Sequence, residues 1–176
     1  MAIEILGMSV EVSAAWLIWI LPFAAALIMP GIGKLSKKST GYVAVGFALM
    51  SAVSAVSLIP VALDGHEVHS QIMWIEALDL KAGVLADPLS IIMANVVGWI
   101  SFLIMIYSTG YMKGDKDITR FWFWMLFFIG SMQLIVLSDN LLQVFFGWEG
   151  VGLASYALIS FWYRDKKKDH VGVEGR

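Results

Sequence analysis

Cysteine is absent from the 176-residue sequence, and histidine is scarce. Without cysteine the chain has no disulfide framework and no thiolate ligands for zinc or iron–sulfur clusters. The three histidines, His66, His69 and His170, fall in polar connecting segments, which argues against haem or metal ligation inside an apolar segment. His66 and His69 are three residues apart, but such a pair in a loop is usually no metal site. We therefore predict no metal in this chain.

Charged residues are also few, at 15% of the chain, whereas apolar residues make up 59% and the mean hydropathy is +0.78. Soluble domains do not have this composition. The sequence lacks the basic N-terminal region of a cleavable signal peptide and a glycine-rich nucleotide-binding loop between a strand and a helix. We predict a single membrane domain over residues 1–176, in contact with the lipid bilayer and without nucleic-acid binding.

Five apolar stretches are long enough to cross a ~30 Å hydrocarbon core at ~1.5 Å per residue. They predict an all-α integral membrane protein with transmembrane helices at about 12–33, 40–63, 88–107, 120–137 and 139–163. Asp87 and Pro88 suit the N-cap and first position of the third helix. Mixed apolar and polar residues at 71–85 predict a small hairpin in the loop between the second and third helices. Residues 164–176 are a tail without predicted structure.

Basic residues are unevenly distributed between the connections. Eleven of the twelve Lys and Arg residues follow the first, third or fifth predicted helix, and only Lys81 lies in the intervening connections. By the positive-inside rule this places the N-terminus outside and the C-terminal tail in the cytoplasm. The sequence therefore predicts a multi-pass protein of the cell (inner) membrane.

The last apolar stretch contains a lone carboxylate, Glu149, roughly 15 Å below its outer end. A charge at that depth costs ~2.5–3.5 kcal/mol and usually faces a bundle interior or a wet cavity. A carboxyl group there can change protonation with its surroundings, as a proton relay requires; the alternative is a neutral acid that serves packing. Asn95, roughly 11 Å deep, is a possible polar neighbour. Tyr156 and Ser160 share the helix face of Glu149, with hydrogen bonds to helices or backbone as their alternative role.

Small residues surround this carboxylate. Gly147, Gly150, Gly152 and Ala154 thin the helix, and we predict that they serve helix packing. Gly150 and Ala154 form a small-x-x-x-small pair, which suits the close approach of another helix.

Several segments carry a family pattern. They read ADPLS at 86–90, DNLL at 139–142, GWEGVGL at 147–153, Ser155-Tyr156 and FWY at 161–163, with further pieces at 107–112, 120–121 and 131–132. In these segments and in helix order the sequence resembles the first five transmembrane helices of the antiporter-like L or chain 5 subunit of proton-pumping NADH:quinone oxidoreductase, respiratory complex I, and its relatives.

The resemblance implies that Glu149 is the glutamate of a first half-channel, which pairs with a lysine on a later helix and translocates protons during quinone reduction. That lysine, the central histidines and the second half-channel have no counterpart here. We therefore expect a split or truncated subunit completed by another polypeptide, or a fragment. The resemblance also implies other membrane subunits as partners. NADH or another reduced donor, quinone and iron–sulfur clusters would belong to those partners, with no cofactor in this chain.

Two alternatives stay open. One is the A-type subunit of a multi-subunit cation/proton antiporter, or a related hydrogenase or bicarbonate-uptake subunit. The other is a structural or assembly membrane protein without transport.

Overall fold

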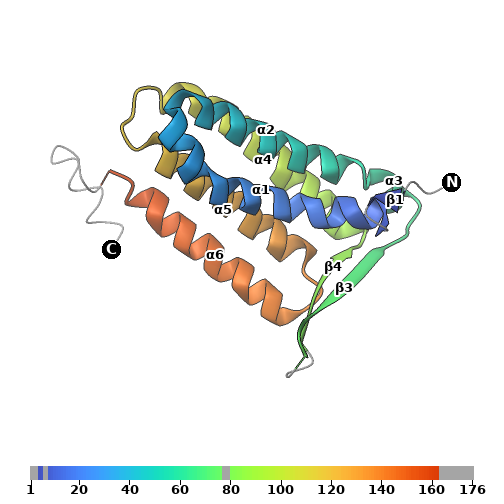
Figure 1. The fold of residues 1–176 in the computed structure, drawn as a ribbon. Helices are drawn as coiled ribbons and strands as arrows, with labels where there is room; N and C mark the ends of the chain where they lie inside the picture. The colour runs from blue at the N-terminus through green and yellow to red at the C-terminus, as the bar shows by residue number, and fades with distance from the viewer. Residues whose placement is uncertain (1–3, 6–7, 77–79, 163–176) are drawn as a thin grey trace.

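Five long helices form the body of the structure, a computed structural model that describes residues 4–5, 8–76 and 80–162. They are α1 (Val10–Leu35), α2 (Lys37–Val56), α4 (Pro88–Tyr111), α5 (Ile118–Leu137) and α6 (Leu141–Ile159). α1 contacts α2 and α5, α4 packs on α2 and α5, and α6 lies along α5 (Figure 1). The described chain thus has five helices long and apolar enough to cross a membrane, which confirms the predicted fold class.

The second predicted helix, 40–63, matches the candidate membrane span Ser39–Leu63, but the helix within that span is interrupted. α2 ends at Val56, and a turn leads into the separate short helix α3 (Ile59–Leu63). Pro60 accounts for the break, because its ring nitrogen carries no hydrogen for the carbonyl group four residues earlier. The break was not predicted because the apolar composition continues through both helices.

The last helix is also shorter than the predicted 139–163. It begins at Leu141, after the N-cap Asn140, and ends at Ile159. Ser160 follows as its C-cap residue. The predicted tail, 164–176, lies outside the described residues.

The start of α4 follows the predicted pattern, with Asp87 as N-cap and Pro88 in the first turn. Asp87 Oδ1 accepts a hydrogen bond from the backbone N–H of Ser90 at 2.7 Å, and Ser90 Oγ accepts one from the N–H of Asp87 at 3.1 Å. The Ser90 hydroxyl also donates to the Asp87 carboxylate. These bonds, first that of the hydroxyl and then that of the backbone N–H, hold the pKa of Asp87 below its ordinary value.

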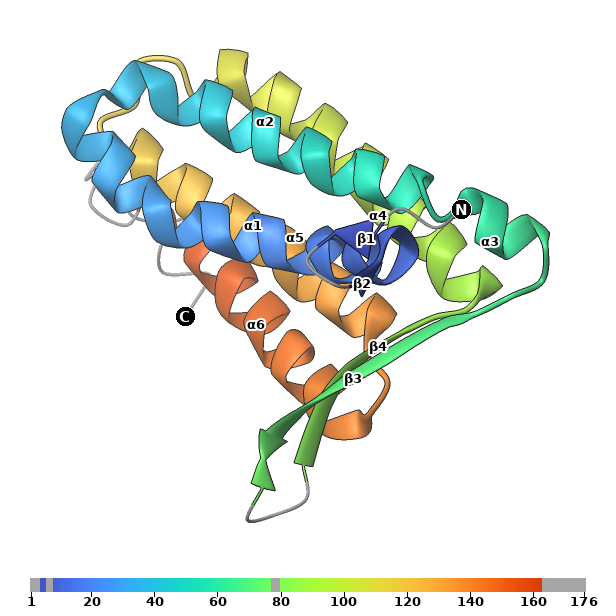
Figure 2. The same cartoon turned by 45° about the vertical axis from the view of Figure 1, so that its right-hand side comes forward.

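The predicted hairpin is present between α3 and α4. Strands β3 (Val68–Ile75) and β4 (Leu80–Ala86) pair antiparallel, with Gln71 opposite Gly83 and an irregularity between Met73 and Ile75. A second, two-residue pair joins β1 (Glu4–Ile5) to β2 (Met8–Ser9) ahead of α1. Figure 2 shows the β3–β4 hairpin running past the start of α6 at one end of the bundle.

The buried core has two parts along the bundle. One lies near the hairpin and includes Ile18, Leu58, Val84, Ile91 and Leu137. The other lies toward the opposite end and includes Met29, Met105, Trp122, Leu126 and Ile129. The α1–α2 turn, the α4–α5 loop and the end of α6 all lie at that opposite end (Figure 1). The connections rich in Lys and Arg therefore share one end of the bundle, while the orientation of that end in a membrane stays a prediction.

Candidate functional site

Helix α6 carries the predicted site, and its start is well defined. Asn140 Oδ1 accepts a hydrogen bond from the N–H of Gln143 at 2.9 Å, which caps the first turn. The helix has 19 residues, most of them apolar. Glu149 lies one position before the midpoint of α6, about 12 Å along the axis from Leu141. The carboxylate is therefore in the middle of a helix of membrane-spanning character.

The two faces of α6 have different environments. One face is buried and packs against α5; it consists of Gln143, Gly147, Gly150 and Ala154. The other face is exposed on the described structure and includes Glu149, Gly152, Leu153 and Tyr156. Steps of three and four residues keep each set on its own side of the helix. Glu149 thus points away from the helix that holds α6 in place.

On the packed face, two glycines let α6 approach α5 closely because glycine has no side chain. A Cβ atom at Gly147 would lie 2.7 Å from Ile135 Cγ1 and 3.0 Å from the carbonyl oxygen of Ser131. A Cβ atom at Gly150 would collide with the Ser131 side chain. Ala154 is fully buried on the same face. These three positions hold α6 close to α5, as small residues do in membrane bundles.

Gly152 differs from the other three residues that the sequence assigned to packing. It lies on the exposed face, and a Cβ atom there would have no neighbour within 4 Å in the described structure. Two residues along a helix correspond to about 200° of rotation, so Gly152 is nearly opposite Gly150. Gly152 is therefore not part of the contact between α5 and α6.

The Glu149 side chain is exposed and makes no hydrogen bond or ion pair with any described residue. Basic residues of the described long helices lie only in end turns: Lys34, Lys37, Lys38 and Arg120. None of them is near the depth of Glu149. The described helices therefore supply no cation for this carboxylate.

Asn95, expected as a polar neighbour of Glu149, faces a different helix. Its side-chain Nδ2 donates to the carbonyl oxygens of Ala55 and Ile91, each at 2.9 Å. Its Oδ1 is buried and has no partner among the described residues. Asn95 thus joins α4 to α2 and does not hydrogen-bond Glu149, because a similar depth does not give two side chains the same direction.

Tyr156 on α6 and the C-cap residue Ser160 both lie beyond Glu149, but their side chains have different environments. Tyr156 is half-exposed on the face of Glu149. Ser160 Oγ donates to the backbone carbonyl of Tyr156 at 2.7 Å. The hydroxyl of Ser160 therefore has a partner in the helix backbone, whereas the phenol of Tyr156 faces outward.

Two polar residues to which the sequence assigned no site role fix the start of α6. Gln143 is buried and pairs with both backbone groups of Gly83, accepting from its N–H at 3.0 Å and donating to its carbonyl at 2.9 Å. The Asp139 carboxylate, almost fully buried, accepts from Gln71 Nε2 at 2.6 Å and lies 3.3 Å from His69 Nε2. These contacts tie the hairpin to the turn between α5 and α6. The only signal for these contacts in the sequence is the presence of polar residues at the start of an apolar helix.

His69 thus contacts Asp139. Among the described residues, no group of three or more His, Asp or Glu side chains has the arrangement of a metal site.

Two segments of the chain match models of known protein families. Residues 73–122 match the family model described as NADH-Ubiquinone oxidoreductase (complex I), chain 5 N-terminus. Residues 138–174, which include the whole of α6, match the model described as NADH:quinone oxidoreductase/Mrp antiporter, TM. The chain is thus similar to this family in both segments. The family's antiporter-type model therefore covers Glu149 together with both faces of its helix.

Named relatives agree with this assignment. NADH-quinone oxidoreductase subunit L of Rickettsia bellii (strain RML369-C) is 39% identical over 92% of this chain and 26% of its own length. NADH-ubiquinone oxidoreductase chain 5 of Dictyostelium citrinum is 39% identical over 82% of this chain and 22% of its own length. The chain thus spans about a quarter of the length of these curated relatives.

The fold also has a counterpart among solved structures. The Mrp complex from Dietzia sp. DQ12-45-1b contains a chain that superposes with a TM-score of 0.69 at 24% identity, over 82% of this chain and 16% of that one. At this identity the likeness concerns the fold. The fold of this chain therefore also occurs in a chain of that Mrp complex.

Proposed function

We propose that this chain forms part of a proton-translocating membrane subunit of a quinone oxidoreductase, in which Glu149 is a proton-relay group. One observation carries the proposal: the carboxylate lies at mid-helix on the open face of α6, while the opposite face is packed on α5. A side chain needed only for packing would lie on the packed face. The position of Glu149 instead suits a group that interacts with further helices or water outside the described bundle.

The electrostatic cost of a carboxylate in a membrane indicates what must surround Glu149. An ionised carboxylate facing lipid at mid-membrane is costly by ~2.5–3.5 kcal/mol, so the open face of α6 needs cover by further helices, water or both. A cation brought close to Glu149 favours its ionised form, and withdrawal of the cation favours its protonated form. A lysine on a helix outside this sequence, as the family resemblance implies, would switch the carboxylate between proton acceptance and release.

Tyr156 extends the same face toward the basic end of the bundle. It is seven residues from Glu149, about 10 Å along the helix axis. That distance is too long for a direct hydrogen bond, so water between the two side chains is part of the proposal. Ser160 would join such a path only by releasing its bond to the Tyr156 carbonyl. Asn95 has no place in it, because its side chain lies between α4 and α2.

The redox steps belong to other chains under this proposal. Electrons would pass from NADH or another reduced donor to quinone on partner subunits, and the membrane domain would move protons in response. Its location would be the cell membrane, with the basic end of the bundle on the cytoplasmic side. Further membrane helices, on this subunit or on a neighbour, would carry the lysine that completes the pair with Glu149.

A second candidate, an A-type subunit of a cation/proton antiporter, is favoured by one observation. The family model over α6 is shared with Mrp antiporters, and an Mrp complex has the same fold. The names of the curated relatives favour the oxidoreductase. Proton movement that depends on quinone reduction separates the two, because an antiporter moves protons in response to a cation gradient alone.

The test replaces Glu149 with Gln in the intact complex in its own membrane. This change keeps the shape of the side chain and removes its ability to release a proton. We expect quinone-linked proton uptake into inverted vesicles to fall by most of its amplitude, with normal amounts of assembled complex. Glu67→Gln is the matched control, because Glu67 is an exposed acid outside the predicted spans. Full proton uptake in a normally assembled Glu149→Gln complex would sink the relay proposal and favour a structural role.

A further inference from the structure

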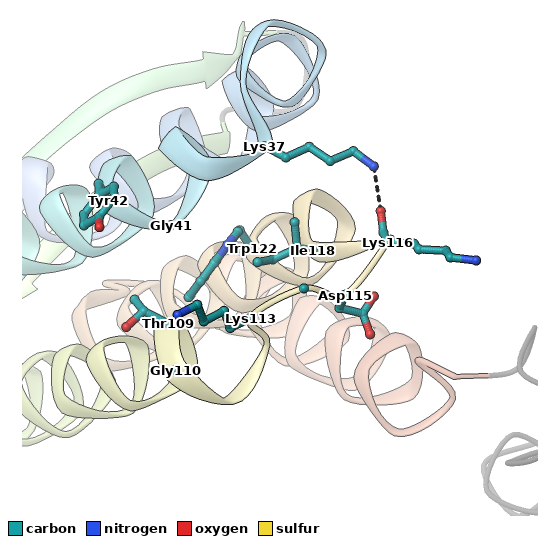
Figure 3. Close-up of a pocket in the computed structure, with 11 residues that line it drawn as sticks. Lys37, Gly41, Tyr42, Thr109, Gly110, Lys113, Asp115, Lys116, Ile118 and Trp122 are labelled. Atoms are coloured by element: carbon teal, nitrogen blue, oxygen red, sulfur yellow. Dashed lines mark hydrogen bonds between the residues drawn. The ribbon is translucent and has the colours of Figure 1, made fainter.

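A cavity of about 950 Å³ opens at the basic end of the bundle, far from the hairpin. Figure 3 shows its lining: the start of α2 on one side, and the end of α4, the α4–α5 loop and the start of α5 on the other. The cavity lies where three of the spans begin or end, which is the depth of lipid headgroups if these helices cross a membrane. None of the relay residues lines it.

The lining carries an excess of positive charge. Lys37, Lys113 and Lys116 all border the cavity, against the single acid Asp115. The carboxylate of Asp115 is already engaged, since Oδ2 accepts from Trp162 Nε1 at 3.2 Å and Oδ1 from a backbone N–H at 2.8 Å. Lys37 Nζ donates to the backbone carbonyl oxygen of Lys116 at 2.9 Å, which links the start of α2 to the α4–α5 loop at the opening. The cavity is therefore suited to an anion.

Two helix N-termini add to this field. Lys37 and Ile118, the first residues of α2 and α5, both line the cavity. Neither helix has a side chain hydrogen-bonded as its N-terminal cap. The first N–H groups of each helix carry a partial positive charge and favour a negative group nearby. The N-termini of α2 and α5, with their partial positive charges, thus both border the cavity.

The cavity wall also contains a donor without an acceptor. Trp122 lines the cavity, and its indole Nε1 is buried without a hydrogen-bond partner among the described residues. Gly41 lets the indole lie against α2, because a Cβ atom there would be only 3.3 Å from the ring. The indole of Trp122 therefore forms part of the cavity wall next to α2.

We propose that this cavity binds the phosphate headgroup of an anionic phospholipid. The apolar surroundings favour a lipid over a free anion: Tyr42, Tyr107 and Tyr111 are exposed around this end of α2 and α4, at 81%, 70% and 59%. Tyrosines at this depth are typical of the headgroup region. Exposed aliphatic side chains such as Leu49 and Leu103 continue along the same helices and offer a surface for acyl chains. Basic pockets between membrane helices bind such headgroups.

The test uses the protein purified from its own membrane with its associated subunits. It is placed in nanodiscs of phosphatidylcholine that contain a small share of phosphatidylglycerol with a photoreactive headgroup. We expect crosslinks at the cavity segments, 37–42 and 109–118, and competition by unlabelled phosphatidylglycerol but not by phosphatidylcholine. Inorganic phosphate is the second competitor. Protection by phosphate without any preference for phosphatidylglycerol would identify a free-anion site and overturn the lipid proposal.

Two variants and one control complete the test. Lys113→Gln with Lys116→Gln removes two charges, and we expect binding roughly 30-fold weaker. Lys34→Gln with Lys81→Gln removes two exposed charges outside the lining and should leave binding unchanged. Gly110→Leu fills the cavity without a backbone clash, because a Cβ atom there has no neighbour within 4 Å, and should block crosslinking at unchanged charge. Equal labelling of both double variants, or full labelling of Gly110→Leu, would overturn the proposal.

Discussion

The close contact between α5 and α6 makes a sharp prediction about two glycines on one helix. At Gly147, an added Cβ atom would meet the carbonyl oxygen of Ser131 at 3.0 Å and the backbone nitrogen of Ile135 at 3.2 Å. Backbone atoms of a packed helix cannot rotate out of the way as a side chain can. At Gly152 the same atom meets nothing within 4 Å. Gly147→Ala and Gly152→Ala are therefore the same substitution at two positions, of which only Gly147 is in close contact with α5.

The expected magnitudes follow from two terms. Alanine stabilises a helix interior over glycine by about 1 kcal/mol, and both variants share this gain. Overpacking a tight contact costs about 1–3 kcal/mol, and only Gly147→Ala has this cost. The free energy of unfolding of the two variants should thus differ by about 1–3 kcal/mol. Gly152→Ala should be at least as stable as the unchanged protein.

The assay is unfolding of the purified protein in detergent micelles by increasing sodium dodecyl sulfate, followed by circular dichroism. We expect a lower midpoint for Gly147→Ala and an equal or higher midpoint for Gly152→Ala. Equal midpoints for the two variants would refute the packing argument, and so would a lower midpoint for Gly152→Ala.

Two further predictions concern the ends of α4 and α6. Asp87→Ala removes the N-cap of α4 and should lower the free energy of unfolding by about 1 kcal/mol. Because Ser90 lowers the pKa of Asp87, this contribution is complete above the ordinary value of 3.8 and disappears as pH falls through the lowered pKa. Thermal unfolding of both proteins in strong acid checks this, and a difference that persists there would contradict it. Gln143→Leu leaves the N–H and carbonyl of Gly83 unpaired, at about 1–3 kcal/mol for each group. We expect faster hydrogen exchange in β4 but not in α1, and unchanged exchange at Gly83 would show that the Gln143 contacts are unimportant.

The spanning helices were predictable because long apolar runs determine their number and order. The capped start of α4 was also readable, since Asp87 and Pro88 are local signals. Reliance on local composition also explains why the break in the second helix was not predicted. Pro60 is flanked by apolar residues on both sides, so composition alone extended the second helix across a real break. The distribution of charge predicted which connections lie at the same end of the bundle. It does not indicate which contacts these connections make there.

The position of Glu149 along its helix and the face that it occupies were predictable, but its neighbours were not. Spacing along α6 indicated that Glu149 and Tyr156 share a face, because helical geometry fixes that relation. Asn95 was paired with Glu149 from depth, and its direction toward α2 depends on how α4 is rotated in the bundle. Gln143 reaches Gly83 across 60 positions of sequence, a contact that no local pattern indicates.

The division of α6 into a packed and an open face separates two kinds of constraint on its sequence. Gly147 and Gly150 are restricted by the shape of α5, and a change there alters the fold before it alters any chemistry. Glu149 and Tyr156 are free of that restriction within the described chain. Substitutions on the open face can therefore vary between relatives without loss of the bundle. The same packed framework can thus carry different side chains on the open face of α6.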